Sequence, residues 1–147
     1  YTFRFAMDHL RRARPRAVYL ALGETDDWAH DGRYDRVLET YARTDAYLRE
    51  LWTWLQADPE HRNRTHLLIT TDHGRGRTAK DWRDHGAKVE GAQDVWIAVA
   101  SPSMSRRGEW KDQPALYTNQ IAATLAGWLD IDWRALRPAA GFPIPRN

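Results

Sequence analysis

The chain has 147 residues, of which 42% are hydrophobic and 29% charged, and these proportions indicate a globular protein with a hydrophobic core, neither disordered nor fibrous. No apolar run approaches the length of a membrane helix, and the absence of cysteine excludes disulfides and thiolate metal sites. The net charge of +2 comes from arginines interleaved with acids, a pattern that favours neither a nucleic acid nor a membrane as partner.

Hydrophobic periodicity predicts three helices and three strands. In chain order they are a helix over 2–13, a strand over 17–23, a helix over 35–56, strands over 66–71 and 95–101, and a helix over 117–129. This order predicts one α/β domain over residues 1–147, with a mostly parallel sheet layered between helices. The 17–23 strand, "AVYLALG", is apolar enough to be buried on both faces of such a sheet.

The predicted helix over 35–56 is the longest periodic segment. We expect it to face the core with one apolar stripe. That stripe comprises Leu38, Tyr41, Ala42, Leu48, Leu51, Trp52 and Leu55.

Acids and histidines follow the predicted strands. Asp26 and His30 follow the first strand, and Asp72 with His73 the second. His85, preceded by Asp84, lies in the loop before the third strand. Ligands of open α/β sheets gather at the carboxyl ends of the strands, so these side chains are candidates for one site. Oxygen and imidazole donors without sulfur suit zinc or manganese.

Each of these groups also has an ordinary interpretation. An acid and a histidine four residues apart are common as a surface pair on a helix. An Asp-His pair after a strand is common in a turn, and a single loop histidine such as His85 needs no ligand. Gly74, Gly76 and Gly86 are expected to be turn residues that need a positive φ.

Four segments together resemble the alkaline phosphatase superfamily. They are "GETDDWAH", "ITTDHGRG", a later "DHG" and the closing "QIAATLAGWL". The resemblance extends from Val18 to Leu129. This superfamily includes phosphatases, nucleotide pyrophosphatases, phosphonate hydrolases, sulfatases and metal-dependent phosphomutases, and its fold is a mostly parallel sheet between helices.

The resemblance implies a site for two divalent metal ions, zinc or manganese. One ion would be held by Asp26, His30 and His85, and Asp27 is an alternative to Asp26 that the family's spacing favours less. The other ion would be held by Asp72 and His73, with two further groups that the family supplies from its N-terminal part.

Other polar residues near these ligands have expected roles. Arg75 and Arg77 follow the Asp-His pair directly and are candidates to bind the oxygens of a phosphate or sulfate ester; solvated loop arginines are the other interpretation. Asp27 and Asp84 are candidates to accept hydrogen bonds from the ligating histidines.

The chain departs from the family at its beginning. The family's serine or threonine nucleophile, and its aspartate after the first strand, have no counterpart before Asp26. Together with a chain that begins at Tyr1, within a predicted helix, this leads us to expect the C-terminal part of a longer enzyme, inactive without the missing part. The expected function is metal-dependent hydrolysis or transfer of phosphate or sulfate esters. The alternative is a non-catalytic α/β binding or regulatory domain without a metal.

Overall fold

The structure is a computed structural model that describes residues 1–105, 108–111 and 114–145. The chain divides into two compact units, the first formed by residues 1–62 and 73–94 and the second by residues 63–72 and 95–147. Among the described residues, no helix combines the length and the apolar character that a membrane span needs. We describe each unit by itself.

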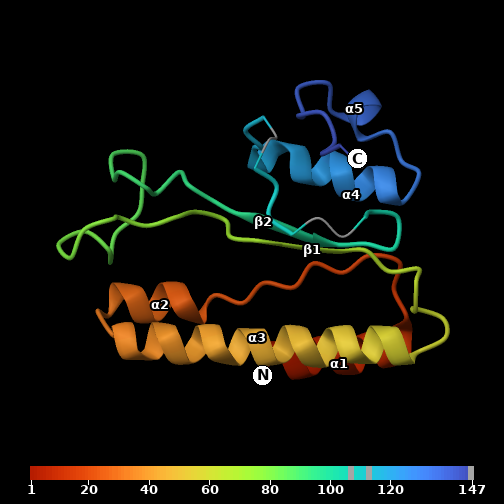
Figure 1. Ribbon diagram of the computed structural model, residues 1–147, viewed down its shortest axis with the longest axis horizontal. Coiled ribbons are helices and arrows are strands. Elements are labelled where there is room, and N and C mark those ends of the chain that lie inside the picture. Colours follow the sequence, from red (N-terminus) through yellow and green to blue (C-terminus); the bar gives the residue numbers. More distant parts are fainter. Residues whose placement is uncertain (106–107, 112–113, 146–147) are drawn as a thin grey trace. The chain divides into compact units, whose positions relative to one another are not determined.

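Three helices form the first unit (Figure 1). They are α1 (Thr2–Ala13), α2 (Glu24–His30) and α3 (Tyr34–Ala57). Both shorter helices lie along α3, with α2 beside its N-terminal end (Figure 1). The helices predicted over 2–13 and 35–56 are therefore confirmed, while α2 is a further helix, beyond the three predicted.

The contact of α1 with α3 is aromatic and apolar. Phe3 and Met7 are buried, and the Phe3 ring stacks on Tyr47 with centroids 4.2 Å apart. Arg4 extends this contact at the surface, where its Nη1 donates to Glu50 at 2.6 Å. Burial of Phe3 and Met7 removes apolar surface from water and so holds α1 in place, although the last turn of the helix carries Arg11 and Arg12.

The buried side of α3 differs from the predicted stripe. The buried residues are Val37, Thr40, Leu51 and Leu55, whereas Leu38 and Tyr41 are exposed by 52% and 55%. Apolar residues lie on several sides of this helix, and the positions of α1 and α2 decide which side is covered. The stripe prediction was right for Leu51 and Leu55 and wrong for the exposed Leu38, Tyr41, Ala42 and Trp52.

The sheet lies in the second unit and is not the one predicted. Strands β1 (Leu67–Thr70) and β2 (Ile97–Ala100) pair antiparallel, with Leu67 opposite Ala100 and Thr70 opposite Ile97. The described part of the chain contains these two strands and is otherwise mostly helical. The expected α/β fold, with a mostly parallel sheet layered between helices, is therefore wrong.

The reason lies in the segments that connect the strands. Parallel neighbours need a crossover of a dozen or more residues, usually a helix, and residues 71–96 between β1 and β2 contain turns but no helix. The predicted strand over 17–23 forms no ladder and instead links α1 to α2, with Val18 exposed by 46% and Tyr19 by 91%. An apolar run becomes a strand only when another strand pairs with it.

The second unit also contains three short helical elements. They are the 3₁₀ turn η1 (Thr118–Gln120), α4 (Ile121–Trp128) and α5 (Trp133–Leu136). The helix predicted over 117–129 is thus confirmed as a 3₁₀ turn followed by an α-helix. Thr124, buried on α4, accepts a hydrogen bond from the Ile144 amide at 2.9 Å. This bond holds the C-terminal tail of the described chain against α4.

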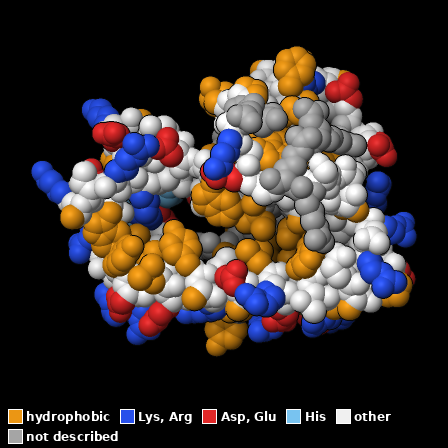
Figure 2. All heavy atoms as spheres, viewed as in Figure 1, with side chains coloured by type: hydrophobic (Ala, Val, Ile, Leu, Met, Phe, Trp, Pro, Cys, Tyr) orange, Lys and Arg blue, Asp and Glu red, His pale blue; other side chains and the backbone are white. Residues whose placement is uncertain are grey.

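Charged side chains of both signs are interspersed on the visible face of the molecule (Figure 2). Several arginines of the first unit form ion pairs with nearby acids, for example Arg43 with Glu24 at 2.8 Å and Arg36 with Glu39 at 2.7 Å. Because acids neutralise them locally, these arginines do not form the continuous basic stripe that a nucleic-acid groove requires.

Candidate metal centre

Helix α2 presents Asp26 and His30 on one side. The two residues are four positions apart, which places them one turn from each other on the same helical face, and Asp26 Oδ2 lies 3.5 Å from His30 Nε2. Ala29, only 1% exposed, is buried where α2 packs against α3. The buried alanine therefore fixes the orientation of the face that carries both polar side chains.

The segment "HGRGR", residues 73–77, approaches residues 81–94 backbone to backbone. The Gly74 amide donates to the Ala92 carbonyl at 2.8 Å, and the Gly76 amide donates to the Asp84 carbonyl at 3.1 Å. A Cβ at Gly74 would lie 2.2 Å from the Gly91 carbonyl oxygen, and one at Gly76 would lie 2.3 Å from that of Asp81. Only glycine fits at these two positions.

This finding corrects the expected role of the glycines. Of Gly74, Gly76 and Gly86, only Gly86 has a positive φ, at 134°. Gly74 and Gly76 are required because their neighbours are too close for a side chain, not because of their backbone angles.

A turn at residues 78–85 brings His85 close to Asp26 and His30. Asp81 Oδ1 accepts hydrogen bonds from the Thr78 hydroxyl and the Thr78 amide, both at 2.7 Å, and these bonds lower the pKa of Asp81. Trp82 packs edge-on against Tyr34 at the start of α3, with centroids 5.4 Å apart. The turn is thereby attached to α3, next to the end of α2. A Thr-x-x-Asp pattern is visible in the sequence and could have indicated this turn.

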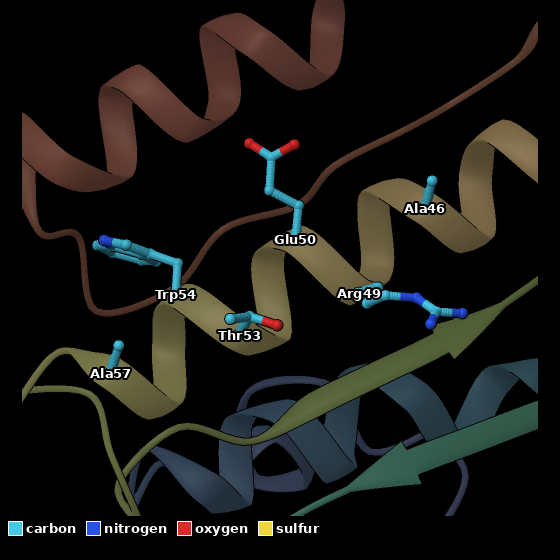
Figure 3. A pocket seen from close by; sticks show the side chains of 6 residues that line it. All are labelled: Ala46, Arg49, Glu50, Thr53, Trp54 and Ala57. Carbon is cyan, nitrogen blue, oxygen red and sulfur yellow. The ribbon is translucent and has the colours of Figure 1, made fainter.

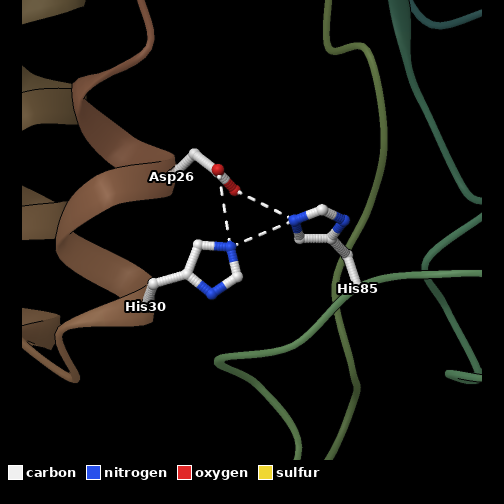
Figure 4. A group of neighbouring side chains, drawn as sticks. All are labelled: Asp26, His30 and His85. Atoms are coloured by element: carbon white, nitrogen blue, oxygen red, sulfur yellow. Dashed lines mark hydrogen bonds and ion pairs between the residues drawn. The ribbon is translucent and has the colours of Figure 1, made fainter.

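Asp26, His30 and His85 converge (Figure 4). His30 Nε2 and His85 Nε2 are 3.1 Å apart, and His85 Nε2 is 3.7 Å from Asp26 Oδ1. With the 3.5 Å between Asp26 and His30, all three pairs of donor atoms are in contact. The side chains remain between 32% and 46% exposed, so the group is open to solvent.

This donor set fits one zinc-sized ion. Ligand atoms at about 2.0–2.2 Å from a tetrahedral zinc are about 3.3–3.6 Å from one another. The observed separations lie near that range: 3.1 Å between the two histidine nitrogens, 3.5 Å from Asp26 Oδ2 to His30 and 3.7 Å from Asp26 Oδ1 to His85. Two imidazoles and one carboxylate are also a chemically suitable set for zinc or manganese.

His73 lies at the edge of this group. Its ring stacks on His85 with centroids 3.8 Å apart and an interplanar angle of 17°, and its Nε2 is 3.6 Å from Asp26 Oδ1. Its Nδ1 lies 2.9 Å from the Gly74 carbonyl oxygen, which orients the ring. Asp72, the other expected ligand of the second ion, belongs to the second unit and is not a member of the three-residue group.

Arg75 contacts the Asp26 carboxylate directly. Its Nη2 donates to Asp26 Oδ1 and, at 3.2 Å, to the Asp26 carbonyl. Its Nη1 donates to the Arg83 carbonyl at 2.7 Å. Partial burial lowers the pKa of this guanidinium, and the negative charge of Asp84 acts in the opposite direction. The contact with Asp26 was not foreseen from sequence, which has no local signal for a pair 49 positions apart.

The remaining expected residues lie apart from the group. Arg77 pairs with Asp94, which raises its pKa, and its Nη1 is 3.7 Å from Glu90. The expected role of Asp27 and Asp84 in orienting the histidines stays a prediction.

A separate depression lies on α3. Figure 3 shows its lining, which comes from that helix alone: Ala46, Arg49, Glu50, Thr53, Trp54 and Ala57. Glu50 is paired with Arg4 and Arg49 with Asp45. The depression therefore offers an apolar surface with neutralised charges and no group of metal-type donors.

Comparison of the chain with protein-family models, characterised proteins and solved structures finds no match. The candidate metal centre therefore rests on its own geometry, and the likeness to the alkaline phosphatase superfamily on the quoted motifs alone.

Proposed function

We propose that Asp26, His30 and His85 bind one divalent metal ion, and that this site serves metal-dependent chemistry on phosphate or sulfate esters. The observation that carries the proposal is the convergence of one carboxylate and two imidazole nitrogens from two separate segments. Side chains 55 positions apart, His30 and His85, meet here, and their separation supports the proposal because it is close to that between two ligands of one zinc ion.

The number of protein donors supports a reactive site over a purely structural one. Structural zinc sites are closed by four protein ligands, whereas catalytic sites use three and leave a position for water or substrate. Three donors with partly exposed side chains correspond to the second kind. A metal in such a site supplies Lewis-acid stabilisation and a water of lowered pKa, while Arg75 supplies a guanidinium suited to phosphate or sulfate oxygens.

The proposal is limited to what this donor set can do. The family resemblance also implies a second ion, and a serine or threonine nucleophile from a missing N-terminal part. Both stay predictions. Hydrolysis and group transfer are equally compatible with three ligands and a neighbouring arginine.

Zinc binding by the purified chain tests the proposal. We expect about one zinc per chain, with a loss of affinity in Asp26→Ala, His30→Ala and His85→Ala beyond the roughly 10–100-fold typical of an outer hydrogen-bond partner. His9→Ala is the matched control, because His9 is exposed on α1 and belongs to no such group. A wild-type chain that binds no more zinc than His85→Ala would contradict the proposal.

The pair formed by Asp26 and Arg75 favours a second candidate function, that of a non-catalytic domain. In that case the ion pair is structural and joins α2 to the loop at residue 75. Arg75→Met would then destabilise the fold, and the wild type would bind no more zinc than His85→Ala, so the same binding assay separates the two functions.

A further inference from the structure

The Arg75 guanidinium takes the place beside Asp26 that a metal cation would use. Its Nη2 is bonded to Oδ1, the oxygen that lies 3.7 Å from His85 Nε2 and 3.6 Å from His73 Nε2. The Arg75 side chain is only 21% exposed, so solvent screens its charge little. A guanidinium keeps its proton at all ordinary pH values, so this cation is always present.

A metal ion at the same carboxylate would meet this charge at close range. Two cations that share one carboxylate repel each other, and the repulsion is strong where water is partly excluded. The charge of Asp26 that would attract the metal is at the same time neutralised by Arg75. The contact therefore opposes metal binding as long as it persists.

We propose that Arg75 closes the site in the metal-free chain, is exchanged for the metal at Asp26, and then binds a tetrahedral oxyanion such as phosphate beside the metal. This inference rests on the metal site proposed above and adds its regulation. Arg75 keeps a second anchor after the exchange, because its Nη1 is bonded to the Arg83 carbonyl. The guanidinium therefore stays near the site, with its planar fork available to two oxygens of the anion.

The exchange makes metal and anion binding cooperative. An anion that holds Arg75 away from Asp26 removes the competing cation and so raises the affinity for metal. By linkage, the metal raises the affinity for the anion by the same factor. Neither effect is expected if Arg75 serves only to orient Asp26.

Zinc affinity of charge variants tests the exchange. We expect Arg75→Met and Arg75→Gln to bind zinc about tenfold more tightly than the wild type in competition with a chromogenic chelator, since a typical coupling is roughly 5–150-fold. Arg75→Gln retains a hydrogen-bond donor for Asp26, so the test can still be made if Arg75→Met does not fold. Arg49→Met is the matched control, because Arg49 pairs with Asp45 on α3, and we expect it to bind zinc like the wild type.

Inorganic phosphate provides the second measurement. It should raise the zinc affinity of the wild type and of Arg49→Met several-fold, and leave that of both Arg75 variants unchanged. Equal or weaker zinc binding by both folded Arg75 variants would overturn the inference, as would a phosphate effect that persists without Arg75.

The two proposals fail in different ways. If the wild type and all Arg75 variants bind no zinc, the metal site is refuted and the exchange with it. If all bind zinc equally, with His85→Ala deficient, the metal site stands and the exchange is refuted.

Discussion

At the level of single residues, Gly74 and Gly76 let two stretches of backbone approach within hydrogen-bond distance. Their amides donate to the carbonyls of Ala92 and Asp84, and His73 and Arg75 alternate with them. The glycines meet residues 81–94 through their backbone, while the side chains of His73 and Arg75 reach Asp26. The two glycines are therefore explained by close backbone packing, and the two residues that alternate with them by their contacts with Asp26.

Gly74→Ala should destabilise the first unit and weaken zinc binding. The new methyl group would lie 2.2 Å from the Gly91 carbonyl oxygen, and relief of such overpacking costs about 1–3 kcal/mol. Displacement of residues 73–77 would also disturb His85, whose ring stacks on His73. Thermal unfolding and chelator competition measure the two effects.

Gly23→Ala is the control for this substitution. Gly23 precedes α2, and a Cβ there would meet nothing within 4 Å, so only the smaller change in helix capping remains. Equal losses of stability in Gly23→Ala and Gly74→Ala would show that close packing at Gly74 is not the reason for the glycine.

At the level of elements, α2 positions two of the three metal-type donors. The helix has seven residues, too few to be stable by itself, so its contact with α3 determines where Asp26 and His30 lie. Acidic residues in its first turn interact favourably with the helix dipole, but they cannot fix its orientation. The buried Ala29 is the residue that does.

Ala29→Leu should therefore lower zinc affinity without altering any ligand. The larger side chain would push α2 away from α3, and we expect a loss of unfolding free energy of about 1–3 kcal/mol together with weaker zinc binding. Denaturant unfolding and chelator competition provide the two measurements.

The same alanine-to-leucine substitution at Ala42 tests whether the expected losses come from packing at Ala29 or from the larger side chain by itself. Ala42 is exposed on α3, so Ala42→Leu should leave stability and zinc binding close to those of the wild type. Zinc affinity unchanged in a destabilised Ala29→Leu chain would show that the position of α2 does not control the site.

Helices and strands of this chain were predictable to different degrees. The periodicity of α1 and α3 depends on residues three or four positions apart, and both helices form where expected. The 17–23 segment has equally strong apolar character, yet it forms no strand. Strand formation requires a distant partner, and no local pattern identifies that partner or its direction.

At the level of the whole molecule, the three donors all belong to the first of two compact units. Asp26, His30 and His85 lie within residues 1–62 and 73–94, whereas β1 and β2 belong to the other unit. A ligand that binds only the folded form stabilises the unit that holds it. Zinc should thus stabilise the first unit and leave the stability of the second unit unchanged.

Hydrogen exchange with and without zinc measures this difference. We expect slower exchange in residues 24–30 and 73–85 on addition of zinc, and unchanged exchange in β1 and β2. The His85→Ala chain should show no zinc effect in either unit. Slower exchange in β1 and β2 equal to that in α2 would contradict a site confined to the first unit.

By itself the sequence determined which side chains of metal-binding type are present and, to within about one residue, where α1 and α3 begin and end. The four-residue spacing of Asp26 and His30 places them on one face of any helix that forms there. The adjacent Asp-His pairs can likewise be read directly from the sequence. These properties are local, since they depend on neighbours within about one helical turn.

Only the tertiary structure decided which of these residues meet. His85 reaches His30 because the turn at residues 78–85 attaches to Tyr34, and Arg75 reaches Asp26 because the glycines admit a close backbone approach. The direction of the β1–β2 pair likewise depends on the path of the long connection between them. Contacts between residues some 50 positions apart depend on how loops pack, and side-chain type alone does not specify that packing.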